Sequence, residues 1–131
     1  KLVIKGIMDP DDAKSAVDIG ADAIVVSNHG GRQLDGTLST VSALPAILDR
    51  VGGDTEVWVD GGIRSGQDIL KAIALGARGT LLGRAYLYGL GSNGQAGVTQ
   101  TLKILKRELD MSMALCGKSS LSDVDTSILY N

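Results

Sequence analysis

The sequence has a single cysteine, little net charge and no long apolar run, and each absence argues against a class of protein. The one cysteine among 131 residues, Cys116, has no partner for an internal disulfide. We expect its thiol to lie buried or half-buried in a helix, and a reducing compartment fits this usage. The net charge of -2, without a basic tail, argues against nucleic acid as a partner. No apolar stretch is long enough to cross a bilayer.

Histidine is just as scarce, and the only one, His29, lies where an apolar run turns abruptly polar. Residues 23–26 predict a buried strand, and two glycines and Arg32 follow the histidine in a tight loop. A group that accepts protons near neutral pH thus lies beside a cation that can grip a carboxylate in a fork. A lone histidine after a strand is more often a satisfied loop or core residue, so its neighbours decide the interpretation.

Glycine is abundant, with 18 residues, and it separates a regular alternation of strands and helices. Such alternation predicts an α/β protein with a parallel sheet and right-handed crossovers, either doubly wound or a barrel. We expect a Gly/Ser/Asn connection at 89–94 and a short capping helix at 122–128. The expected strands are 2–6, 23–26 and 56–60, and residues 79–84 form the fourth strand and its terminal loop. The expected helices are 10–19, 40–51, 66–75 and 96–115.

The unusual polar residues favour a barrel, because they lie at or just after the carboxyl ends of the expected strands. (β/α)8 barrel enzymes keep their chemistry at that end. Each residue also has a simpler interpretation: Lys5 as a solvent-facing strand end and Asp60 as a loop cap. The residues that share this position are Lys5, His29, Arg32, Asp60, Arg64 and Arg84.

Two glycine-rich loops predict a phosphate site. Residues 61–66, Gly-Gly-Ile-Arg-Ser-Gly, precede an expected helix, whose backbone N–H groups and dipole favour an anion. Gly83 and Arg84 come one βα unit later and add a second N–H group and a guanidinium. Either loop alone is a weak signal, but their succession predicts a phosphate between neighbouring loops.

The run Ser27-Asn28-His29-Gly30-Gly31-Arg32-Gln33 resembles the active-site signature of the FMN-dependent 2-hydroxy-acid dehydrogenases and oxidases. The similarity covers essentially all 131 residues and corresponds to the C-terminal portion of such proteins. It implies a (β/α)4 half of a (β/α)8 TIM barrel, strands 5–8 plus C-terminal helices, with residues 1–131 as one domain fragment. The sequence starts inside an expected strand and without Met, which agrees with the expectation of a fragment. We expect the fragment to pair with a missing N-terminal half or to form a homo-oligomer.

The resemblance also implies how FMN is held. Lys5 would lie near N1 and O2 of the flavin and stabilise its anionic reduced form. Asp60 would contact the ribityl chain, and Ser27 would hydrogen-bond the flavin or help to position it. The FMN phosphate would be bound by Gly61, Gly62, Arg64, Gly83 and Arg84.

For the substrate, the resemblance implies that Arg32 binds the carboxylate of a small 2-hydroxy acid and that His29 is the general base. Whether His29 takes the hydroxyl or the C2 proton stays open. Residues 83–90 look most like the bacterial respiratory L-lactate dehydrogenase branch, although Ala85 stands where the family commonly has proline. That branch implies oxidation of L-lactate to pyruvate, with a quinone or another electron acceptor. It also implies a cytoplasmic protein, or a peripheral one on the cytoplasmic face of the inner membrane.

Two alternatives remain at this point. The chain could come from another FMN- or nucleotide-binding barrel enzyme, although a phosphate loop alone needs neither Lys5 nor the His-Gly-Gly-Arg run. It could also be a non-catalytic half-barrel that binds a phosphate-bearing ligand or serves assembly. The aspartate that orients the histidine in the family lies outside this chain, so we expect the isolated fragment to be inactive. We expect no metal site.

Overall fold

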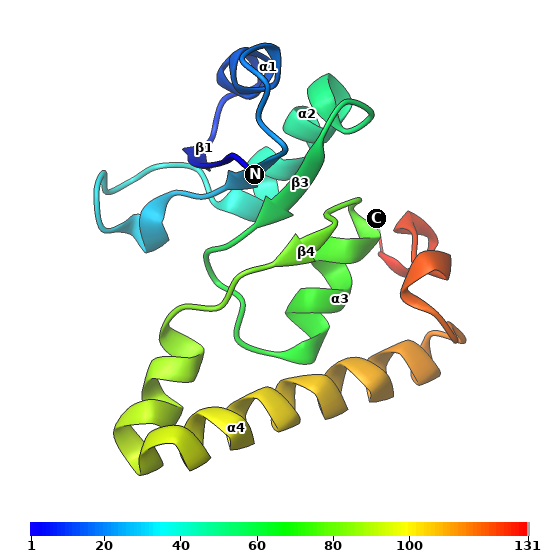
Figure 1. Cartoon of the computed structure of the whole chain (residues 1–131). Coiled ribbons are helices and arrows are strands. Elements are labelled where there is room, and N and C mark those ends of the chain that lie inside the picture. The colour runs from blue at the N-terminus through cyan, green and yellow to red at the C-terminus, as the bar shows by residue number, and fades with distance from the viewer. Residues whose placement is uncertain (131) are drawn as a thin grey trace.

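Four parallel strands alternate with helices in the computed structural model, which describes residues 1–130 (Figure 1). The strands pair in chain order, β1-β2-β3-β4, which confirms the predicted parallel sheet. The strands are β1 (Val3–Ile7), β2 (Ala23–Val26), β3 (Glu56–Val59) and β4 (Gly79–Thr80). The helices are α1 (Pro10–Asp18), α2 (Thr40–Val51), α3 (Gly66–Ala74) and α4 (Arg84–Leu115).

The hydrophobic core lies between one face of the sheet and the helices. Every second residue of a strand points to the same face, so Ile24 and Val26 of β2 share that face with Val57 and Val59 of β3. Leu44 and Ile47 of α2 pack against them and are completely buried. The opposite face carries the row Lys5, Val25 and Trp58, which the strand register aligns. Lys5, at the carboxyl end of β1 on this second face, is one of the side chains that line the site described below.

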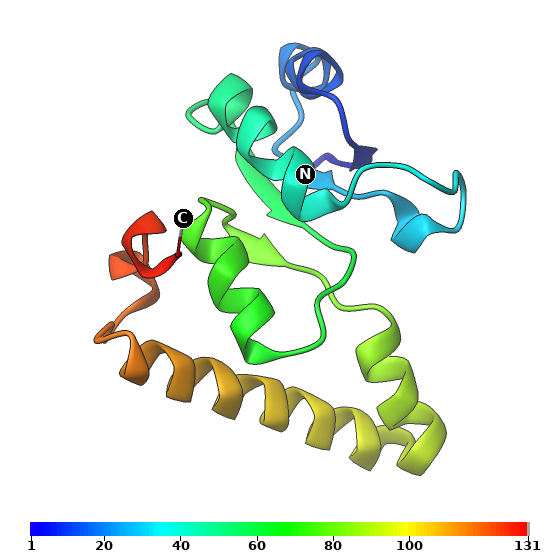
Figure 2. The ribbon, with the colours of Figure 1, turned by 180° about the vertical axis from the view of Figure 1, so that it is seen from behind.

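The end of the chain differs from the prediction. Helix α4 begins at Arg84, so most of the expected connection at 89–94 is helical, with a break at Asn93 and Gly94. The glycines serve packing here: a Cβ on Gly89 would lie 2.6 Å from the carbonyl oxygen of Gly97, so the two arms of α4 approach backbone to backbone. Beyond the break the long arm runs beside α3 (Figure 2).

The tail also differs, and so does the cysteine. Instead of a helix at 122–128, two 3-10 turns form, at Leu121–Asp123 and Thr126–Ile128. The side chains of Ser120 and Asp125 each accept a backbone N–H two residues on, and such local bonds compete with a helix. Cys116 ends α4 and is exposed, so the prediction of a buried thiol was wrong.

Within residues 1–130 no helix combines the length and apolarity needed to cross a membrane.

Candidate active site

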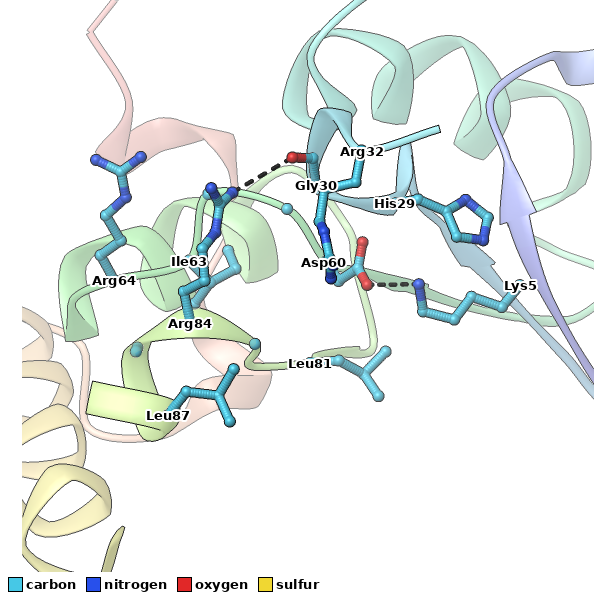
Figure 3. A pocket seen from close by; sticks show the side chains of 14 residues that line it. Lys5, His29, Gly30, Arg32, Asp60, Ile63, Arg64, Leu81, Arg84 and Leu87 are labelled. Carbon is cyan, nitrogen blue, oxygen red and sulfur yellow. Dashed lines mark hydrogen bonds and ion pairs between the residues drawn. The ribbon is translucent and has the colours of Figure 1, made fainter. Parts of the chain in front are cut away.

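A pocket of about 240 Å³ lies at the carboxyl ends of the strands (Figure 3). Four cationic side chains and one carboxylate line it, so the pocket is positive although the chain is slightly negative. All predicted site residues except Ser27 line this one pocket: Lys5, His29, Arg32, Asp60, Gly61, Gly62, Arg64, Gly83 and Arg84. Gly30, Ile63, Leu81, Ala85 and Leu87, which were not predicted, complete the lining.

Lys5 connects the ends of the first three strands. Its Nζ lies 2.7 Å from the Oδ2 atom of Asp60 and donates a hydrogen bond of 2.7 Å to the Oγ atom of Ser27. Ser27 is almost fully buried, behind the pocket, and its Oγ also accepts the backbone N–H of His29 at 3.2 Å. Ser27 therefore joins the lysine to the histidine loop. The Lys5 side chain is 42% exposed, so it faces solvent as the simpler interpretation expects, but it also lines the pocket and contacts Asp60 and Ser27.

Two polar groups around Lys5, the carboxylate of Asp60 and the hydroxyl of Ser27, can each form a further hydrogen bond. The Oδ1 atom of Asp60 is buried and makes no hydrogen bond within the described part of the chain. Both contacts given above for the Ser27 oxygen come from donors, so its own O–H proton is not used in either. Buried polar atoms are normally paired, so an unpaired carboxylate oxygen beside a pocket points to a ligand with a hydrogen to donate.

His29 begins a 3-10 turn (His29–Gly31) with its backbone in the left-handed region, at φ 55°. Few residues other than glycine adopt this conformation, and such strain concentrates at functional sites. Asn28 fixes the turn: its Oδ1 atom accepts the N–H of Gly30 at 3.0 Å, and its amide donates to the carbonyl of Leu38 at 3.3 Å. Arg32 follows directly, so the histidine and the arginine reach the pocket from one short turn.

The N-terminus of α3 is less available to an anion than the sequence predicted. Glu108 of α4 accepts the N–H of Gly66 at 2.8 Å, and Ser65 accepts the N–H of Asp68 at 3.2 Å. The carboxylate of Asp68 accepts the N–H groups of Arg64 and Ser65 in return. Burial alone would raise the pKa of Asp68, but these hydrogen bonds hold that pKa below its usual range.

The N-terminus of α4 is more open than that of α3. Gly83 is its N-cap, no side chain caps it, and its first residues line the pocket. Free N–H groups at a helix start, together with the helix dipole, favour an anion. The guanidinium of Arg84 reaches across the pocket and donates to the carbonyl of Gly30 at 3.4 Å. Among the predicted phosphate-binding groups, the start of α4 and the loop 61–63 therefore stay open to the pocket, whereas the first N–H of α3 does not.

Thr40 supports the loop after β3, and sequence reasoning missed it as a site residue. Its side chain is 2% exposed, and its hydroxyl donates to the carbonyls of Asp60 at 2.5 Å and Gly61 at 3.2 Å. Ser39, directly before it, is the N-cap of α2 and makes no side-chain cap bond. In the sequence Thr40 is only the first residue of an expected helix, a position that does not predict a contact with the loop after β3.

Fold and site together define an α/β protein with a cationic ligand pocket at the carboxyl ends of parallel strands, where such proteins bind ligands. The chain belongs to the FMN-dependent dehydrogenase family, which it matches over residues 1–131. FMN is the cofactor of this family.

Named relatives narrow the comparison. The chain is 57% identical over 128 residues to an L-lactate dehydrogenase of Caulobacter vibrioides and 56% identical over 129 residues to an L-lactate oxidase of a Nostoc species. These alignments cover 98% of the chain, but only 33% and 35% of the relatives. The chain therefore spans about a third of the length of the curated relatives it matches.

Solved structures agree in fold. A tyrosine-to-phenylalanine mutant of a mandelate oxidase with a monooxide FMN adduct superposes with a TM-score of 0.90 and 51% identity, over 93% of this chain and 39% of that one. A mandelate oxidase with benzoyl-formic acid gives a TM-score of 0.90 and 51% identity, over 93% of this chain and 36% of that one.

Proposed function

We propose that this chain is the C-terminal part of an FMN-dependent enzyme that oxidises a small L-2-hydroxy acid, L-lactate in the first place, to the 2-oxo acid. The observation that carries the proposal is the shared pocket: the only histidine and Arg32 line the same cavity as the Lys5–Asp60 pair and the uncapped start of α4. A proton acceptor, a carboxylate-binding group and an anion site are thereby adjacent.

The architecture we propose for the whole protein is a (β/α)8 barrel to which this chain contributes strands 5–8. The four βα units and the length of the relatives, about three times that of the chain, support this. The pocket is smaller than the roughly 300–1,000 Å³ of ordinary ligand sites, as expected for part of a larger site.

The residues present fit FMN. The unpaired Oδ1 atom of Asp60 can accept a hydrogen bond from a ribityl hydroxyl, and the O–H proton of Ser27 is available to a flavin acceptor atom. Lys5 supplies a fixed positive charge. The phosphate would be held by the loop of Gly61 and Gly62, by the start of α4 at Gly83, and by Arg64 and Arg84.

The chain's own groups would then handle the substrate. Arg32 would hold the substrate carboxylate through two parallel charge-assisted hydrogen bonds and so orient C2 and its hydroxyl group. His29 would take a proton from the substrate as general base. When bound, FMN supplies an acceptor for the two electrons that leave the substrate.

The relatives' names support L-lactate over an aromatic hydroxy acid. The relatives named for L-lactate are 57% and 56% identical to the chain, whereas the mandelate oxidase structure with the FMN adduct is 51% identical. The names divide between dehydrogenase and oxidase, so we propose to compare a quinone with oxygen as electron acceptor. A cytoplasmic or membrane-peripheral location stays a prediction.

Titration of the chain with FMN, followed by flavin fluorescence, tests the cofactor site. We expect Arg84→Ala to weaken binding by roughly 10- to 100-fold, the effect of losing a hydrogen bond to a charged group. Arg107→Ala is the matched control, because Arg107 lies exposed on the same helix and does not line the pocket. Equal affinities for the two variants would contradict the placement of the phosphate.

A further inference from the structure

Gly6 forms a β-bulge at the point where β1 reaches the pocket. Lys5 pairs with Val25 and Ile7 pairs with Val26, so Gly6 is an extra residue without a partner on β2. Its φ is +103°, in the region that favours glycine. The bulge lets Lys5 face the pocket while Ile7, two residues on, packs against the core instead of following Lys5.

The imidazole ring of His29 lies against this bulge. A Cβ on residue 6 would be 3.0 Å from the Cε1 atom of His29, 3.7 Å from its Nδ1 atom and 4.0 Å from its Nε2 atom. A carbon–carbon approach of 3.0 Å is well inside the usual contact distance of 3.5–4.0 Å. A side chain at residue 6 would therefore require the ring to shift by a few tenths of an ångström.

The backbone of His29 offers little freedom to relieve such a clash. Its φ of 55° is set by the 3-10 turn, and its N–H is bonded to the buried Ser27. A side chain at residue 6 would consequently push the ring about its own side-chain torsions, since the backbone is held on the other side.

We propose that Gly6 is the positioning residue for His29: its bare α-carbon forms the surface on which the imidazole rests at the pocket. The inference rests on the proposed function, in which His29 is the general base, and it adds a residue outside the predicted site. A general base must lie within hydrogen-bond reach of the proton it takes, so a displaced ring loses proton transfer while Arg32 still binds the carboxylate.

The test uses the full chain. His29 is its single histidine, so the NMR spectrum contains one histidine Hε1 signal, and that signal belongs to His29. We expect a nuclear Overhauser contact between that proton and the α-protons of Gly6. We expect Gly6→Ala to shift the Hε1 resonance. A missing contact in the unsubstituted chain would overturn the proposal, and this measurement does not depend on any variant folding.

Gly20→Ala is the matched control for backbone strain. Gly20 has a φ of +89°, like Gly6, but a Cβ there would meet no atom within 4 Å. We expect Gly20→Ala to leave the Hε1 resonance in place, and equal shifts in the two variants would overturn the proposal. We also expect Gly6→Ala to lower the denaturation midpoint less in a His29→Ala background than in the unsubstituted chain. An equal loss in both would show strain alone and contradict the ring contact.

Titration of the same samples with FMN separates the two proposals. The Overhauser contact reports where the ring lies, and the FMN titration reports whether the pocket holds the cofactor. A chain that shows the contact supports the placement of the ring even if FMN fails to bind, a failure that would count against the proposed function.

Discussion

Replacing Thr40 by valine tests how the loop after β3 is held. The side chains have nearly the same shape, so Thr40→Val removes the hydroxyl without opening a cavity. Two carbonyls, those of Asp60 and Gly61, lose their donor in a part-buried place. A buried acceptor left unpaired costs about 1–3 kcal/mol, and we expect a loss of about 2 kcal/mol because the longer of the two bonds is weak.

Trp58, the only tryptophan, is half-buried on β3 two residues before this loop and reports unfolding by its fluorescence in urea. Thr99→Val is the control, since within residues 1–130 the hydroxyl of Thr99 bonds one group, the carbonyl of Gln95, on an exposed helix face. We expect the control to stay within about 0.5 kcal/mol of the unsubstituted chain. We also expect FMN to bind Thr40→Val more weakly, because the loop carries part of its site. The reasoning is refuted if Thr40→Val is no less stable than Thr99→Val.

Three further predictions concern pH, substrate and association. The lowered pKa of Asp68 means that its stabilising effect is complete above its unfolded value of about 3.9 and is lost as pH falls through the folded value. Asp68→Asn should therefore lower the urea midpoint at pH 7 and flatten its fall below about pH 4; an unchanged acid profile would contradict this. In the complete enzyme, Arg32→Lys should raise KM and lower kcat together, by about tenfold or more in kcat/KM, because one cation replaces a two-pronged contact; steady-state kinetics with wild-type values would refute the assignment. Because β1 and β4 are open sheet edges, sedimentation of the isolated chain should show self-association, and a monodisperse monomer with a cooperative melt would disprove it.

The order of elements could be predicted because each strand and helix carries its own periodicity and glycine boundary. The carboxyl ends of parallel strands meet at one edge, so Lys5, His29 and Asp60 could be expected to lie together from their positions alone. The sequence misled at 89–94, where glycines that usually mark a loop serve close packing of two helical arms.

The supporting contacts could not be predicted, because they join residues far apart in the chain. The carboxylate of Glu108, 42 residues further along the chain, accepts the N–H of Gly66, so this N–H is not free for the anion predicted at the start of α3. The bulge at Gly6 depends on the register between β1 and β2, which no local pattern encodes. The local sequence around Thr40 predicts only the start of a helix. Its hydrogen bond to the loop after β3 depends on how α2 packs against the sheet.

The most direct test of the central claim uses a chimera in which residues 1–131 replace the matching third of the Caulobacter vibrioides L-lactate dehydrogenase. L-Lactate is added without oxygen, and the loss of flavin absorbance is followed by stopped flow. We expect the chimera to bind FMN and to be bleached by L-lactate. We expect His29→Gln to keep FMN bound and to bleach about 10²- to 10⁴-fold more slowly, the usual contribution of a general base. Equal bleaching rates with and without His29, in proteins that both hold FMN, would contradict the account.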